Sequence, residues 1–245
     1  GDHAMPETAD NVAKECNITR EQADEFALGS QKKYAKAEAE GFFKGEILPI
    51  ALPSKKKDAP PAMVEADEHP RRDATMESLA KLKALYEGGV VTAGNASGVN
   101  DGAAALVIAS RKWGEKNGKK PIARVRSAAS AAVEPRVMGI GPAFAIPLAL
   151  ERAGLTLKDM DVIEINEAFA SQVLGCLHLM KVDFKDPRVN PNGGAIAIGH
   201  PLGCSGARLA LTVARQLKET GSKYAAVSLC IGVGQGLAVI LENVN

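Results

Sequence analysis

Three short stretches of this sequence hold the residue types that do chemistry. The first is the run Asn-Glu-Ala-Phe at 166–169, which follows an apolar segment with the character of a strand. The second, at 190–206, is glycine-rich and contains His200. The third, at 230–236, opens with Cys230 and has glycine at every second position after it. Glycines in such turns let backbone N–H groups approach a ligand closely, and sites gather at strand ends in layered α/β proteins.

A cysteine and a histidine in glycine-rich turns predict thiol chemistry. The thiolate is the reactive form, and an imidazole can lower the thiol pKa or relay its proton. An alternative stays open at this point, with Cys230 a buried strand-end residue and His200 a turn residue whose hydrogen bonds are satisfied. Neither glycine stretch continues into Gly-Lys-Ser/Thr or has the dinucleotide spacing, which disfavours a nucleotide cradle. The four cysteines form no Cys-x-x-Cys pair, which excludes zinc-ribbon and thioredoxin-type sites.

In the second half of the chain, predicted strands alternate with predicted helices, and the three stretches described above lie at their ends. Strands are predicted at 122–125, 162–165, 225–229 and 237–241, and helices at 146–153, 168–180 and 207–217. Such alternation indicates an α/β layered domain, and its last two strands, joined by a short turn, should be antiparallel.

The first half of the chain is predicted to be helical and then irregular. A capping box at 19–22 starts a helix that Gly41 ends. Residues 46–50 are expected to form a short edge strand. Residues 51–75 are rich in proline and charge and are expected to form an exposed loop. A sharper interpretation is that some basic residues of this loop meet a phosphorylated ligand.

The composition narrows the class of protein. The chain has 245 residues, of which 46% are hydrophobic, and 30 basic residues against 29 acidic ones give a net charge of +1. This balance gives no support for nucleic-acid binding. We find no apolar run near the roughly 18 residues of a membrane span, and no signal-peptide pattern. Scattered cysteines predict a reducing compartment, taken as the cytoplasm, with an organelle address upstream left open.

The chain resembles the thiolase family in several stretches that occur in family order. The three C-terminal motifs of that family match NEAF at 166–169, GHPLGCSGAR at 199–208 and CIGVGQG at 230–236. Further family blocks resemble ADNVA at 9–13, MESLAKLK at 76–83 and TAGNASGVNDGAAAL at 92–106. The resemblance covers essentially the whole chain. MPETADNVA, VEPRVMGIGP at 133–142 and CIGVGQG favour the 3-oxoadipyl-CoA thiolase branch.

The resemblance implies an acyltransferase that cleaves a 3-oxoacyl-CoA with coenzyme A, or runs the reverse Claisen condensation, in β-oxidation or aromatic degradation. Cys230 matches the family's acid/base cysteine, and His200 matches the histidine that activates the nucleophilic cysteine. Asn166 matches the asparagine that holds a water in one oxyanion hole, which His200 completes. The backbone N–H of Gly232 matches a donor of the second oxyanion hole. Preorganised donors of this kind are each worth about 2.7–4 kcal/mol.

The resemblance also implies a binding groove for coenzyme A, which is a substrate here and not a covalently bound cofactor. Positions that line the groove or surround the pantetheine and acyl group match Met5, Arg71, Ser78, Ala93, Ser97, Ala168 and Phe169. A guanidinium at Arg71 suits the nucleotide phosphates. No metal is implied. Acyl-CoA and CoA are the expected partners, and family members are commonly dimers or tetramers.

The fold implied is the thiolase-type layered fold, with a C-terminal half, a loop domain and little of the first half. Residues 1–97 match the loop domain that covers CoA, residues 98–120 match a remnant of the N-terminal domain, and residues 121–245 match the C-terminal domain. Without the rest of its sheet, the remnant should leave unpaired edges and apolar faces.

The chain departs from the family pattern at the nucleophile. Family members carry the nucleophilic cysteine well before the position of Met5, so we expect this chain to be a truncated thiolase. Cys16, Cys176 and Cys204 match no nucleophile motif. Two alternatives remain, a catalytically inactive CoA-binding fragment and a partner of a full-length thiolase subunit.

Overall fold

The computed structural model describes residues 3–54 and 60–244. Its centre is a mixed four-stranded sheet of β3 (Ala123–Ala132), β6 (Gln235–Asn243), β5 (Tyr224–Ile231) and β4 (Val162–Ile165), in that order. β4 runs parallel to β5, whereas β6 is antiparallel to both β5 and β3. The antiparallel pairing of the last two strands confirms the sequence prediction.

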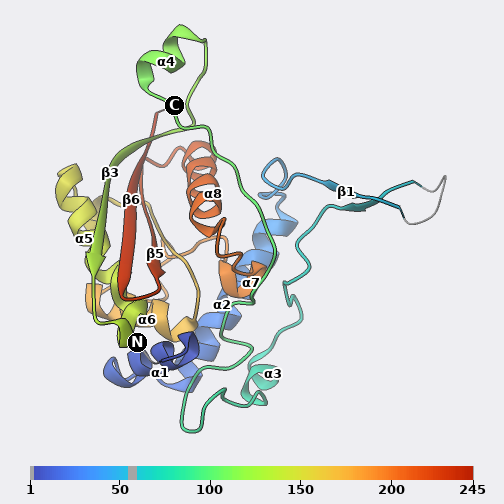
Figure 1. The fold of residues 1–245 in the computed structure, drawn as a ribbon, viewed down its shortest axis with the longest axis vertical. Helices are drawn as coiled ribbons and strands as arrows, with labels where there is room; N and C mark the ends of the chain where they lie inside the picture. Colours follow the sequence, from blue (N-terminus) through green and yellow to red (C-terminus); the bar gives the residue numbers. More distant parts are fainter. Residues whose placement is uncertain (1–2, 55–59, 245) are drawn as a thin grey trace.

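Helices cover both faces of this sheet, with α5 (Gly141–Ala153) and α8 (Ser205–Thr220) on opposite sides (Figure 1). Side chains alternate between the faces along each strand. In β5, Ala226 packs with Ile146 of α5, whereas Val227 packs with Leu209 and Val213 of α8. Helix α6 (Ala170–Met180) lies on the α5 side and joins the same core. The result is a layered α/β domain, which confirms the predicted fold class.

The first part of the chain packs against this domain at one end of the sheet. Helix α1 (Met5–Glu15) contacts α6 and the 3₁₀ helix η1 (Pro135–Ile140), and α2 (Arg20–Ala39) contacts α6 and α7 (Ala195–Ile198). The small hairpin of β1 (Ile50–Leu52) and β2 (Ala62–Val64) projects away from the body (Figure 1). The remaining short elements are α3 (Met76–Ala80), α4 (Arg111–Lys116) and η2 (Leu157–Asp159).

Several elements begin or end where the sequence predicted. The capping box forms at the start of α2, where Thr19 Oγ1 accepts from Gln22 N at 3.2 Å and Gln22 Oε1 accepts from Thr19 N at 2.9 Å. Gly154, in the left-handed region at φ 69°, ends α5. The predicted strand at 162–165 matches β4, whose four residues are all buried. The helix ends and the strand that short sequence patterns predict are therefore present in the structure.

Three expectations were wrong or incomplete. The strand expected at 46–50 does not form, because the strand there, β1, begins only at Ile50 and pairs with β2. That hairpin lies inside the stretch expected to be only a loop, of which residues 55–59 lie outside the described part. Strand β3 extends to Ala132, well past the predicted end at residue 125. Its alanine-rich second half has weak intrinsic preference for a strand and is held by pairing with β6.

The segment at 98–110 contains no helix or strand, and α4 is the one regular element of the 98–120 region. Three apolar side chains of residues 98–110 are almost fully exposed, Val99 at 93%, Val107 at 92% and Ile108 at 82%. The expected apolar exposure is therefore present. Among the residues that the structure describes, none of the helices is long and apolar enough to cross a membrane.

Candidate active site

The site is built where β4 and β5 end. The two strands are parallel and Ile165 pairs with Ser228, so their carboxyl ends lie at the same edge of the sheet. Asn166 follows β4 directly, and its backbone N donates to Ser228 O at 2.9 Å. Cys230 lies two residues beyond Ser228 on β5. The parallel pairing of β4 with β5 therefore places the stretch at 166–169 and the stretch at 230–236 at the same edge of the sheet.

His200 reaches this edge from the loop between α7 and α8. Its Nε2 lies 3.3 Å from Asn166 Nδ2, and its Nδ1 lies 2.6 Å from Ser205 Oγ. Its backbone N donates to Gly98 O at 3.1 Å and approaches Asn100 Oδ1 at 3.3 Å. The ring is therefore held at both nitrogens, and the loop is held by a segment about 100 residues away.

Cys230 lies in an apolar setting beside the NEAF stretch. The side chain is 8% exposed and packs with Met138, Ala168 and Phe169. Burial raises the pKa of the Cys230 thiol to about 12. In this chain the thiol is therefore protonated at neutral pH.

Electrostatics favour a neutral imidazole at His200. Burial lowers its pKa, and the nearby Arg208 guanidinium lowers it further. Arg208 Nη1 lies 3.5 Å from Glu164 Oε1, and the Glu164 side chain is 2% exposed. Burial raises the pKa of Glu164 to about 8, although Arg208 opposes the shift. The neutral ring is the form that a general base requires.

The glycine-rich turn between β5 and β6 is tight at one end and open at the other. Val233 and Gly234 both have positive φ, at 70° and 89°, and a Cβ added to Gly234 would lie 2.1 Å from Val133 O. A Cβ added to Gly232 would meet no atom within 4 Å. The backbone at Gly232 therefore borders open space beside Cys230.

The positions matched to CoA binding fall into two groups. Ser97 is joined to the NEAF stretch, because its N and Oγ donate to Ala168 O at 3.0 and 3.1 Å. Phe169 forms a bridge with Ala96 and packs in the Cys230 cluster. The other positions are exposed on the loop region and on α1, namely Met5, Arg71, Ser78 and Ala93. The structure therefore places two of the seven positions, Ala168 and Phe169, against Cys230, and a third, Ser97, against Ala168.

The other cysteines differ from Cys230 in their surroundings. Cys176 is fully buried in the core of α6, and its thiol donates to Gly139 O at 3.2 Å. Cys204 is buried at the start of α8, and Cys16 is half-buried at the end of α1. Burial raises the thiol pKa of all three. None therefore has the lowered pKa that marks an activated thiol.

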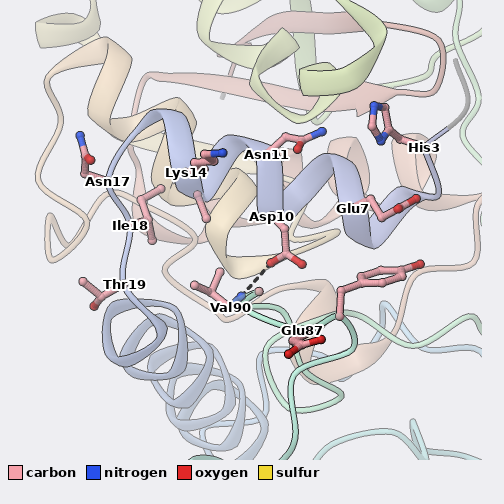
Figure 2. A pocket seen from close by; sticks show the side chains of 14 residues that line it. His3, Glu7, Asp10, Asn11, Lys14, Asn17, Ile18, Thr19, Glu87 and Val90 are labelled. Carbon is pink, nitrogen blue, oxygen red and sulfur yellow. Dashed lines mark hydrogen bonds between the residues drawn. The ribbon is translucent and has the colours of Figure 1, made fainter.

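An open cavity of about 860 Å³ lies elsewhere, between α1 and the turn at 86–90. In its wall, Asp10 accepts a hydrogen bond from Val90 N at 2.8 Å (Figure 2). Asp10 also accepts from Val91 N at 3.0 Å. His3 and Glu7 also line it. None of the four predicted catalytic residues lines this cavity, so the chemical site is defined by the strand ends instead.

Two residues of the site were not singled out from the sequence. Glu167, inside NEAF, is 1% exposed and accepts hydrogen bonds from Ser30, Asn190 and Ile196. Ser205 holds the His200 ring. Both lie in stretches that the sequence highlighted, but their partners come from distant parts of the chain or from a turn whose geometry no spacing specifies.

Comparison with known proteins agrees with this geometry. The thiolase C-terminal domain model matches residues 119–243, and the thiolase N-terminal domain model matches residues 1–112. The chain belongs to the thiolase family. It is 54% identical over all 245 residues to the 3-oxoadipyl-CoA/3-oxo-5,6-dehydrosuberyl-CoA thiolase of Escherichia coli K12, and covers 61% of that protein. This confirms the resemblance to the 3-oxoadipyl-CoA branch.

Solved structures give the same result for the fold. The acetyl-CoA acetyltransferase of Bacillus anthracis superposes with a TM-score of 0.93 and 43% identity, over 98% of this chain and 60% of that one. Human mitochondrial 3-ketoacyl-CoA thiolase in complex with CoA gives a TM-score of 0.88 and 43% identity, over 98% and 58%. This chain thus spans about 60% of the length of the relatives it matches.

Proposed function

We propose that this chain provides part of a thiolase-type acyltransferase that cleaves a 3-oxoacyl-CoA with coenzyme A, or runs the reverse Claisen condensation. The observation that carries the proposal is the 3.3 Å approach of His200 Nε2 to Asn166 at the edge where Cys230 lies. The 54% identity to a 3-oxoadipyl-CoA thiolase favours a dicarboxylic 3-oxoacyl-CoA as the substrate.

Each catalytic residue has a role that its surroundings support. His200 takes the proton of a nucleophilic thiol, which attacks the 3-oxo carbon of the substrate. The bond between C2 and C3 then breaks, and Cys230 gives its proton to the acetyl-CoA carbanion that departs. A buried, protonated thiol suits this step. The resulting thiolate then takes the proton of incoming CoA, whose sulfur attacks the acyl-enzyme and releases the second product. The nucleophilic thiol leaves as a thiolate and takes its proton back from His200.

Two groups stabilise negative charge on oxygen in this scheme. The N–H of Gly232 borders open space and donates to one oxyanion. Asn166 orients a water for the other, beside His200 Nε2. Asn166 Oδ1 fits this role because it is buried and receives no hydrogen bond from the described residues. Preorganised donors in a buried site act strongly because they need no rearrangement during the reaction.

The groove for CoA runs, in this proposal, over the loop domain at residues 1–97. Ser97, Ala168 and Phe169 contact the pantetheine end near Cys230. Met5, Arg71, Ser78 and Ala93 lie along the remainder of the groove. CoA is a substrate, and the scheme uses no resident cofactor. We also propose that residues 98–120 belong to the N-terminal domain, that residues 121–245 form the C-terminal domain, and that the parent enzyme is an oligomer in a reducing compartment.

The nucleophilic thiol needs a source beside His200. Cys176 is core and Cys16 lies on the far end of α1, and the thiol pKa of Cys204 is raised by burial. We propose that a part of the thiolase fold that these 245 residues do not cover supplies the nucleophile. The chain alone then binds CoA without turnover.

A thiolysis assay tests this proposal. The purified chain receives 3-oxoadipyl-CoA and CoA, alone and with the cysteine-bearing N-terminal part of the Escherichia coli relative, while loss of enolate absorbance is followed. We expect turnover only in the mixture, abolished by His200→Ala or Cys230→Ala and retained by Cys16→Ala. Turnover by the chain alone would show that one of its own cysteines is the nucleophile. Absence of both CoA binding and complementation would refute the proposal.

A further inference from the structure

The hydroxyl of Ser205 lies between the His200 ring and a backbone carbonyl. Ser205 is 2% exposed at the first position of α8. Its Oγ lies 2.6 Å from His200 Nδ1 and 2.9 Å from Pro201 O. Pro201 O also accepts from the backbone N of Cys204 and of Ser205, both at 3.0 Å. The hydroxyl is therefore in hydrogen-bond contact with two groups at once.

The single proton of this hydroxyl decides which ring nitrogen carries hydrogen. Pro201 O can only accept, so the proton of Ser205 Oγ points to it. Ser205 Oγ then accepts from His200 Nδ1, which must carry the ring proton. In the opposite tautomer, Ser205 Oγ would donate to Nδ1 and its lone pairs would face Pro201 O at 2.9 Å with no proton between them. That arrangement is repulsive.

The other end of the ring agrees independently. Asn166 Nδ2 lies 3.3 Å from His200 Nε2, and an amide nitrogen only donates. Nε2 must therefore offer a lone pair. A proton on Nε2 would place two donors against each other, in addition to the repulsion at Ser205. Both contacts of the ring thus select the same tautomer.

We propose that Ser205 is a positioning residue that holds the His200 proton on Nδ1 and so keeps the Nε2 lone pair aimed at the reacting thiol. The catalytic consequence rests on the function proposed above, whereas the tautomer does not. After Nε2 takes the thiol proton, Nδ1–H keeps its bond to Ser205, the Asn166 amide gives up its contact with Nε2, and the new Nε2–H donates to an oxyanion. The ring serves as base and then as donor without turning.

Nitrogen-15 NMR tests the assignment on the chain as it stands, without substrate. Long-range ¹H–¹⁵N spectra of ¹⁵N-labelled protein distinguish a protonated ring nitrogen from one with a lone pair. The His200 signals are identified by their loss in His200→Gln. We expect Nδ1–H and an unprotonated Nε2 in the neutral ring. In Ser205→Ala, the ratio of the Nδ1–H to the Nε2–H tautomer should fall by about fivefold or more, the scale of one neutral hydrogen bond.

Two controls separate this effect from a general loss of structure. Ser205→Thr keeps the hydroxyl and should keep the tautomer. Ser127 lies on β3, away from the ring, and its Oγ donates to Ala149 O at 2.6 Å. Ser127→Ala should therefore change nothing at His200. If Ser205→Ala fails to fold, Ser205→Cys replaces it, because a thiol is a weaker acceptor of similar shape.

Either of two results would overturn the proposal. One is an Nε2–H tautomer in the wild-type chain. The other is a wild-type Nδ1–H tautomer that Ser205→Ala, or Ser205→Cys in its place, leaves unchanged. Because no step of the measurement needs CoA or turnover, a failed thiolysis assay leaves this inference standing. A failed tautomer test likewise leaves the proposed acyl transfer to its own assay.

Discussion

Replacing Glu167 with glutamine should destabilise the chain far more than its conservative shape implies. Glu167 is 1% exposed, and its carboxylate accepts hydrogen bonds from three donors in three different segments of the chain. Its Oε2 accepts from Ser30 Oγ of α2 at 2.6 Å and from Ile196 N of α7 at 3.2 Å. Its Oε1 accepts from Asn190 Nδ2 at 2.9 Å. A carboxylate, which only accepts, is therefore the matching partner at this position.

Glutamine offers one acceptor and one donor, and neither orientation satisfies all three partners. With its oxygen toward Ser30, its amide NH₂ faces Asn190 Nδ2. Asn190 cannot turn, because its Oδ1 accepts from Ile165 N and its Nδ2 donates to Ile165 O, both at 2.9 Å. In the other orientation the NH₂ faces the backbone N of Ile196, which only donates, so donor meets donor there even if the Ser30 hydroxyl turns. The substitution must therefore set donor against donor.

The size of the effect follows from these lost contacts. A hydrogen bond to a charged group contributes about 1.5–3 kcal/mol, and an unsatisfied buried donor costs about 1–3 kcal/mol. We expect Glu167→Gln to lower the free energy of unfolding by about 2–4 kcal/mol. For a domain of this size that corresponds to a melting temperature lower by roughly 5–15 °C.

Urea unfolding followed by circular dichroism measures this change, with Glu219→Gln as the matched control. Glu219 is 46% exposed and pairs with Arg215 at 3.0 Å on the surface of α8. Exposed pairs contribute about 0–1 kcal/mol, so the control should stay close to wild type. A Glu167→Gln chain within about 0.5 kcal/mol of wild type would mean that the three partners rearrange freely, and the reasoning would be wrong.

Three further predictions concern pH and packing. Since burial raises the pKa of Cys230 to about 12, iodoacetamide should alkylate it in the folded chain at pH 8 at least about a hundredfold more slowly than in urea, by peptide mass spectrometry. Burial raises the folded pKa of Glu164 to about 8, above its unfolded value. Stability is therefore lost as pH rises from about 5 to 8, and Glu164→Gln should flatten this fall by up to about 1.4 kcal/mol per pH unit in urea titrations. Gly236→Ala should destabilise strongly in thermal melts, because its Cβ would lie 2.2 Å from the carbonyl carbon of Gly141, whereas Gly206→Ala, with no atom within 4 Å, should be neutral or stabilising.

The sequence predicted the parts of this protein that local chemistry decides. The strand at 162–165 was predicted because three of its four residues are apolar and β-branched, and the helix start at Thr19 because its side chain caps the next turn. The rule that sites lie at strand ends pointed to Asn166 and Cys230, and the parallel pairing of β4 with β5 brings them to one edge. Each of these needs only neighbours in the chain or the topology of the sheet.

The remaining features depend on pairings that no local signal encodes. Strand β3 continues to Ala132 because β6 pairs with it, although serine and alanine give that stretch little tendency to form a strand. Asn100 meets the His200 backbone across about 100 residues, and nothing in its sequence neighbourhood points to that partner. The pKa of Cys230 depends on how deeply the thiol is buried, which spacing does not reveal.

Consecutive residues of the NEAF stretch contact different segments of the chain and so hold the site together. Asn166 faces His200, Glu167 gathers α2, α7 and the 190 turn, and Ala168 packs on Cys230 while accepting two hydrogen bonds from Ser97. Successive side chains after a strand point in different directions, so each contacts a different segment. A disturbance at Glu167 should therefore propagate to the His200 loop, because α7 leads directly into it. Glu167, which holds the structure together, is therefore next in sequence to Asn166 and Ala168, because the end of β4 positions all three.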